Sequence, residues 1–81
     1  MGRFYFHLRA GEQLIPDVKG LDLPDVAAAR HEAIHSAREI MAEAIRAGQN
    51  RVPDAFVIAD DAGREIDTVS LAMVLPDPFK R

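Results

Sequence analysis

One long helical pattern in the middle of this 81-residue chain constrains its fold more than any other feature. From Pro24 to Ala47, apolar residues recur at the three- and four-residue spacing of an amphipathic helix. Asp22 or Leu23 is the expected N-cap, and Gly48 suits the position after the last turn. The row predicted to face the core consists of Val26, Ala29, Ala33, Ala37, Ile40 and Ala44, flanked by Ile34, Met41 and Ile45. Such a helix needs a second layer against which to bury this row.

Short segments on both sides of the helix predict that layer. Their alternation or continuous apolar character is typical of strands. The expected strands cover residues 3–9, 14–17, 55–59 and 65–69. Ser70 either continues the last strand or caps a short helical turn through Met73. The predicted fold is an α+β two-layer sandwich with element order β-β-α-β-β, in which one long helix crosses one face of a small, mainly antiparallel sheet.

The chain length allows one small domain, expected over residues 1–75, with residues 76–81 as an irregular tail containing Pro76 and Pro78. The absence of cysteine excludes disulfide scaffolds, cysteine-based metal sites and thiol nucleophiles. A net charge of −3 does not indicate the excess of basic residues that binding to nucleic acid requires. We therefore expect no nucleic-acid partner and no cofactor. Without a long apolar run or a signal-peptide pattern, we expect a cytoplasmic protein with no membrane association.

One motif suggests metal chemistry. His31-Glu32-Ala33-Ile34-His35 matches H-E-x-x-H, in which two histidines one helical turn apart bind Zn²⁺ and the glutamate acts as general base. A catalytic zinc needs a third protein ligand, and the sequence pattern supplies none. His31 and His35 also fall on the polar side of the predicted helix. A metal-dependent hydrolase therefore stays an alternative to a surface motif without metal.

Two sets of residues are candidates for a contact surface. Tyr5, His7 and Arg9 lie on the strand face that a two-layer sandwich leaves without a helix. Aromatic residues and arginine are enriched at protein interfaces. A helix over residues 24–47 would be about 36 Å long, whereas a six-residue strand is about 20 Å long. The helix should therefore extend past its sheet, and Met41 and Ile45 on that end would suit contact with a second copy.

The chain resembles a family of short bacterial proteins known only as a domain of unknown function, of the type YFFHLRxG…DxxGxxLPD…AAxxEAxxxARE. The matching residues are Phe4-Tyr5-Phe6-His7-Leu8-Arg9 with Gly11, then Asp17, Gly20 and Leu23-Pro24-Asp25, then Ala28-Ala29, Glu32-Ala33 and Ala37-Arg38-Glu39, and finally Ala62-Gly63-Arg64. Ala10 departs from the acidic residue common in the first turn of that family. The resemblance implies an α+β fold and a bacterial origin without supplying an activity.

Three functions follow as hypotheses. The favoured one is a non-enzymatic protein-interaction module acting as a homodimer. The second is an antitoxin-like or regulatory inhibitor of a partner protein, since the chain is also loosely similar to antitoxins of the HicB kind without their DNA-binding segment. The third is the hydrolase using the motif at residues 31–35.

Overall fold

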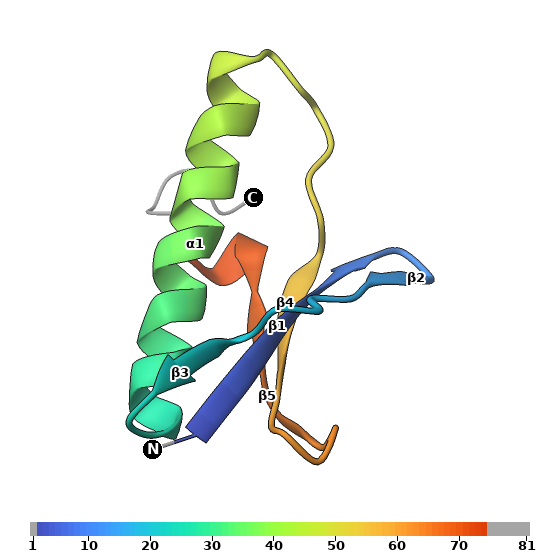
Figure 1. Ribbon diagram of the computed structural model, residues 1–81. Coiled ribbons are helices and arrows are strands. Elements are labelled where there is room, and N and C mark those ends of the chain that lie inside the picture. Colours follow the sequence, from blue (N-terminus) through green and yellow to red (C-terminus); the bar gives the residue numbers. More distant parts are fainter. Residues whose placement is uncertain (1, 75–81) are drawn as a thin grey trace.

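A computed structural model describes residues 2–74 of the chain as a five-stranded antiparallel sheet with one helix packed on it (Figure 1). The elements are β1 (Gly2–Ala10), β2 (Gln13–Ile15), β3 (Leu21–Leu23), α1 (Val26–Arg46), β4 (Ala55–Ala59), β5 (Glu65–Ser70) and the 3₁₀ helix η1 (Leu71–Val74). The strand order is β2-β1-β4-β5, and β3 pairs with the other half of the same edge of β1. The predicted α+β architecture is confirmed, and the predicted tail at residues 76–81 lies outside the described residues.

The expected element order lacks one strand. Leu21–Leu23 forms β3, antiparallel to the start of β1, with Asp22 opposite Arg3. The predicted cap at Asp22 or Leu23 is therefore wrong, and α1 begins after Asp25, whose carboxylate accepts the Ala28 N–H at 2.8 Å. The strand escaped prediction because three residues carry no periodicity of their own. Its pairing with β1 and the ion pair from Arg3 to Asp22 at 3.3 Å hold it in place.

The other boundaries agree closely with the pattern. The second strand stops at Ile15, because Pro16 has no N–H for the ladder. Ser70 ends β5, and the helical turn starting at Leu71 follows directly, so both alternatives for this stretch occur in succession. Gly63 takes a positive φ of 80° in the turn between β4 and β5, as a tight hairpin requires.

The core lies between α1 and the sheet. From the helix it takes the fully buried alanines Ala29, Ala33 and Ala37. Because alanine is short, the helix backbone lies close to the sheet. The larger side chains come from the strands and η1, namely Phe4, Phe56, Ile58, Val69 and Leu71. One ion pair fastens the two layers at the edge, from Arg30 of α1 to Asp67 of β5 at 2.6 Å.

The helix covers only part of the sheet. It packs against β3, β4, β5 and η1, and its C-terminal part extends past the ends of the strands (Figure 1). At the other side of the molecule, β2 projects away from α1. The expected overhang of the helix is confirmed, and an edge of the sheet also lies beyond the helix.

Candidate functional site

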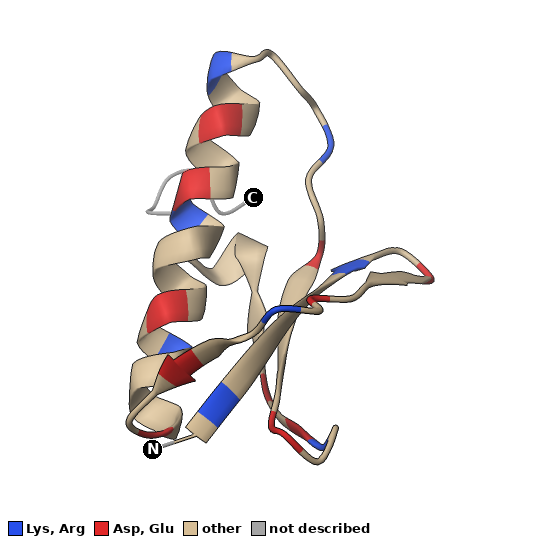
Figure 2. Cartoon of the chain, viewed as in Figure 1, with Lys and Arg blue, Asp and Glu red and all other residues tan. Residues whose placement is uncertain are grey.

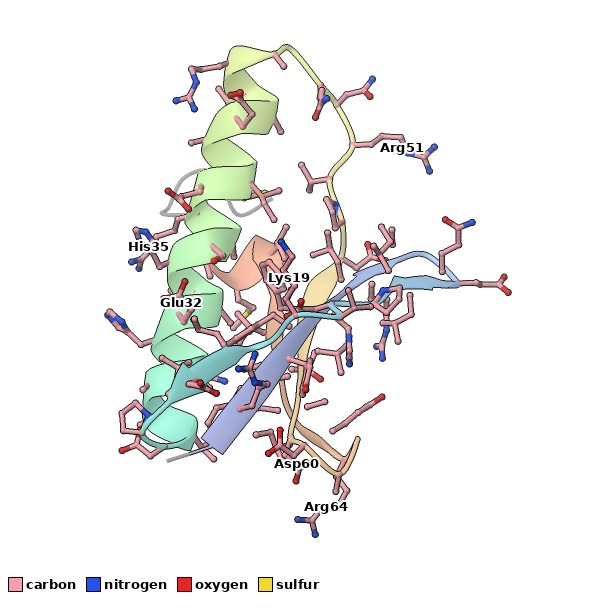
Figure 3. The ribbon with its side chains drawn as sticks, in the orientation of Figure 1. Lys19, Glu32, His35, Arg51, Asp60 and Arg64 are labelled. Carbon is pink, nitrogen blue, oxygen red and sulfur yellow. The ribbon has the colours of Figure 1, made fainter. Side chains whose placement is uncertain are left out.

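The H-E-x-x-H motif lies on the outer side of α1. His31 and His35 are exposed, and His35 points away from the sheet (Figure 3). The nearest acidic contact of His35 is Glu39, one turn on, at 3.8 Å from Nε2. Among residues 2–74, no group of three or more His, Asp or Glu side chains is arranged to hold a metal ion. The motif therefore offers two histidines to solvent without a third ligand from the described part of the chain.

Tyr5, His7 and Arg9 lie on the face of β1 directed away from α1, as expected. Phe6 and Leu8, which alternate with them, pack against the core. The rings of Tyr5 and His7 are stacked, with centroids 6.4 Å apart and an interplanar angle of 15°. Both side chains are half-buried, whereas Arg9 is exposed.

A loop packs against part of this face, which the sequence pattern did not indicate. The middle of β1 has no neighbouring strand between β2 and β3, and Asp17 fills that place. Its carboxylate accepts the backbone N–H of Phe6 at 3.1 Å and the N–H groups of Lys19 and Gly20 within its own turn. The Asp17 N–H donates to His7 Nδ1 at 3.0 Å. Asp17 therefore ties the β2–β3 connection to β1.

These contacts also set the charge state of Asp17. Partial burial of its carboxyl raises the pKa, but the three backbone N–H groups of Phe6, Gly20 and Lys19, with an electrostatic contribution from the neighbouring His7, lower it by more. The pKa therefore lies below the ordinary value of 3.8. The carboxylate is ionised at neutral pH and engaged by these donors.

Gly20 allows the same loop to approach β1 closely. Its φ is +70°, and a Cβ atom there would lie 2.8 Å from Arg3 Cγ and 2.9 Å from Tyr5 Cε2. At these distances a Cβ atom would force the Arg3 or Tyr5 side chain to shift. Glycine is thus favoured at this position both by its backbone angle and by the space it leaves.

The second predicted set, Met41 and Ile45, lies on the helix and is not joined to the first. Met41 packs against the core, whereas Ile45 is 68% exposed. Because α1 covers the opposite face of the sheet from Tyr5 and His7, the structure does not bring the two candidate sets into one surface.

A run of exposed apolar side chains that the sequence pattern missed follows the outer edge formed by β2, β3 and their connection, with Leu14 on the sheet face of Arg9 and with Ile15 and Leu21 on the opposite face. We call it the apolar edge, and it consists of Leu14, Ile15, Val18 and Leu21. Val18 is 83% exposed at the tip of the connection, and Ile15 is 52% exposed. The available signal was Val18 itself, a β-branched residue placed between Asp17 and Lys19 in a turn.

The end of the sheet near β2 also carries a hollow of about 500 Å³. It is lined by Ala10, Gly11, Asn50, Arg51, Val52 and Asp54. The Asp54 carboxylate accepts the Gly11 N–H at 2.8 Å, which joins the β1–β2 turn to the connection before β4. Arg51 extends away from this connection (Figure 3). The lining mixes apolar and polar groups and contains no pair of groups placed for acid–base chemistry.

Charged residues of both signs occur on the helix and on the sheet. The charged residues of α1 are Arg and Glu of both signs, and Arg46 forms an ion pair with Glu43 one turn away at 3.2 Å (Figure 2). The sheet carries fewer charges, with Arg3 on β1 bonded to Asp22 on β3. No helix within residues 2–74 is both long and apolar enough to cross a membrane.

A comparison with family models assigns the chain to a family. The model of the domain of unknown function DUF6894 matches residues 3–72, which is most of the chain. This chain belongs to the DUF6894 family. The match confirms that the chain is a member of a family of unknown function. Searches of the curated proteins and of the solved structures found no match.

Proposed function

We propose that this DUF6894 member is a non-enzymatic bacterial protein-interaction module that acts in the cytoplasm as a homodimer. The apolar edge is the observation that carries the proposal. Four large apolar side chains between Leu14 and Leu21 are exposed on one continuous segment. Apolar groups gathered on a protein surface favour burial against another protein.

The position of these side chains favours a second copy as the partner. β2 forms hydrogen bonds on one side with β1, and its other side is an outer edge of the sheet. An unpaired strand edge can pair with the same edge of another copy about a twofold axis. Antiparallel pairing centred on Leu14 would place Gln13 of each copy opposite Ile15 of the other. Such pairing would place Leu14 of each copy against Leu14 of the other and would add buried surface to a domain that is small by itself.

The oligomeric state tests the proposal. Light scattering and sedimentation equilibrium over a concentration series should give a mass twice the 8.9 kDa of the chain. A double variant, Ile15→Lys with Val18→Lys, places two charges in the proposed interface and should weaken the dimer by about tenfold or more. Circular dichroism and a thermal melt would show that the variant monomer is folded.

Met73→Lys is the matched control, because Met73 is 71% exposed on η1, away from the apolar edge. This variant should dimerise as the unmodified chain does. A mass of one chain at every concentration would contradict the proposal, and so would a double variant that dimerises with unchanged affinity.

A further inference from the structure

A second surface borders the apolar edge at Leu14, the cross-strand neighbour of Arg9, and differs from it in its chemistry. Tyr5, His7 and Arg9 all offer hydrogen-bond donors from the face of β1 that α1 does not cover, and we call this set the donor face. The neighbouring β4 residues opposite them are Ala59, Val57 and Ala55. These residues bring neither charge nor a side-chain acceptor to the donor face.

His7 is a fixed donor on this face. Its Nδ1 accepts the Asp17 N–H at 3.0 Å, so in the neutral ring the proton is on Nε2. Nε2 therefore presents an N–H group instead of a lone pair. This state suits an acceptor such as a carboxylate oxygen and does not suit a metal ion.

Arg9 adds a charge that the described part of the chain does not neutralise. Its guanidinium forms no ion pair with a carboxylate among residues 2–74, whereas Arg3 of the same strand is bonded to Asp22. Two acidic residues that contact β1 or its following turn are already engaged by backbone N–H groups. Asp17 accepts three backbone N–H groups, and Asp54 accepts the Gly11 N–H.

The spacing of the donors indicates the form of the ligand. Residues two apart on a strand repeat at about 6.8 Å, and the Tyr5 and His7 rings are 6.4 Å apart. Alternate side chains of an extended peptide repeat at the same interval. A second copy of the donor face would instead bring Arg9 against a like charge, which disfavours self-association here.

From this arrangement we infer that the donor face binds an extended acidic segment of a different protein, with carboxylates meeting Arg9 and His7. The inference extends the interaction role to an unlike partner and does not rest on the homodimer. It would give the chain a way to recognise a partner while its apolar edge holds a second copy.

An oligoglutamate peptide with blocked ends is the probe, titrated into the isotope-labelled full chain at low salt near neutral pH. Amide shifts should concentrate on residues 5–9 and yield a binding constant that weakens as salt rises. Arg9→Gln should weaken binding by about tenfold, the value of one charge-assisted hydrogen bond. Arg38→Gln is the matched control, since Arg38 is exposed on α1, and its effect should stay below about twofold.

Several results would overturn the inference. Shifts confined to α1, or binding that Arg9→Gln leaves unchanged, would place the contact elsewhere. An absence of amide shifts at millimolar peptide would mean that the donor face does not bind an acidic segment. Tighter binding of a single-stranded oligonucleotide or of inorganic phosphate to residues 5–9 would assign the face to phosphate instead of carboxylate. The oligomeric mass of Arg9→Gln, measured in parallel, shows whether the homodimer forms regardless of whether the peptide binds.

Discussion

At the scale of single residues, Asp17 does most to shape the surface of the molecule. A strand neighbour is missing in the middle of β1, and one carboxylate takes its place by accepting the Phe6 N–H. The same residue closes the turn that exposes Val18 and donates its own N–H to His7. Through its carboxylate and its backbone N–H, Asp17 therefore organises both the apolar edge and the donor face.

Replacing this carboxylate should destabilise the fold. Asp17→Asn keeps the size of the side chain but removes the negative charge to which three backbone N–H groups donate. The new NH₂ group would also face one of these three donors. The free energy of unfolding should fall by roughly 1–3 kcal/mol in urea denaturation. Asp61→Asn, at an exposed position in the β4–β5 turn, should change it by less than about 0.5 kcal/mol. Equal effects of the two substitutions would contradict this role for Asp17.

The pH dependence of this contribution has a definite sign. The Asp17 pKa in the folded chain lies below the 3.8 of an unperturbed aspartate, so the unfolded chain binds the proton more readily. The stabilisation is complete above pH 3.8 and is lost as the pH falls through the lower folded-state pKa. The difference in unfolding free energy between the unmodified chain and Asp17→Asn should therefore narrow on acidification below about pH 4. A difference that grows in acid would contradict the assignment.

At the scale of elements, the alanines of α1 determine how the two layers meet. Ala29, Ala33 and Ala37 are fully buried, so the contact between helix and sheet has no room for a longer side chain. The strands supply the bulk of the core instead. This division explains how a chain with 13 alanines builds a core from few large residues.

Enlarging the middle alanine should separate the layers. Ala33→Leu adds three carbon atoms where the exposed fraction is 0%, and overpacking should reduce the free energy of unfolding by about 1–3 kcal/mol. Ala27→Leu places the same side chain on the exposed side of α1 and should change it by less than about 0.5 kcal/mol. Thermal and urea denaturation of the two variants would measure the contrast. An Ala33→Leu variant as stable as Ala27→Leu would show that the contact between helix and sheet has room for a larger side chain.

At the scale of the whole molecule, the η1 turn belongs to the core although it follows the last strand. Leu71 is fully buried between the helix and the sheet, and its N–H donates to Asp54 O at 3.0 Å. This contact connects η1 to the connection before β4. The helix, the sheet and η1 thus share one core.

Truncating Leu71 tests whether this side chain joins η1 to the core. Leu71→Ala should lower the free energy of unfolding by about 2–5 kcal/mol, because it leaves a cavity among residues from several elements. Met73→Ala in the same turn should change it by less than about 0.5 kcal/mol, since that side chain is 71% exposed. The measurement is denaturant unfolding followed by circular dichroism. Similar losses for both variants would mean that η1 contributes as a turn and not through Leu71.

The sequence alone determined the elements whose pattern is local. The spacing of alanines predicted α1 and its buried row, and strand alternation separated Phe6 and Leu8 from Tyr5, His7 and Arg9. These predictions held because helix and strand periodicities are properties of consecutive residues. The tight turn at Gly63 was predicted because glycine takes a positive φ without strain.

Only the tertiary structure decided the features that depend on residues far apart in the chain. β3 exists because Leu21–Leu23 meets the start of β1, and the loop at Asp17 covers part of the donor face because Phe6 lacks a strand neighbour there. Exposure of Ile15 and Val18 likewise depends on which part of the sheet α1 covers. Short segments carry too little pattern to reveal such contacts. Their conformation is fixed by hydrogen bonds and packing that form only when the whole chain has folded.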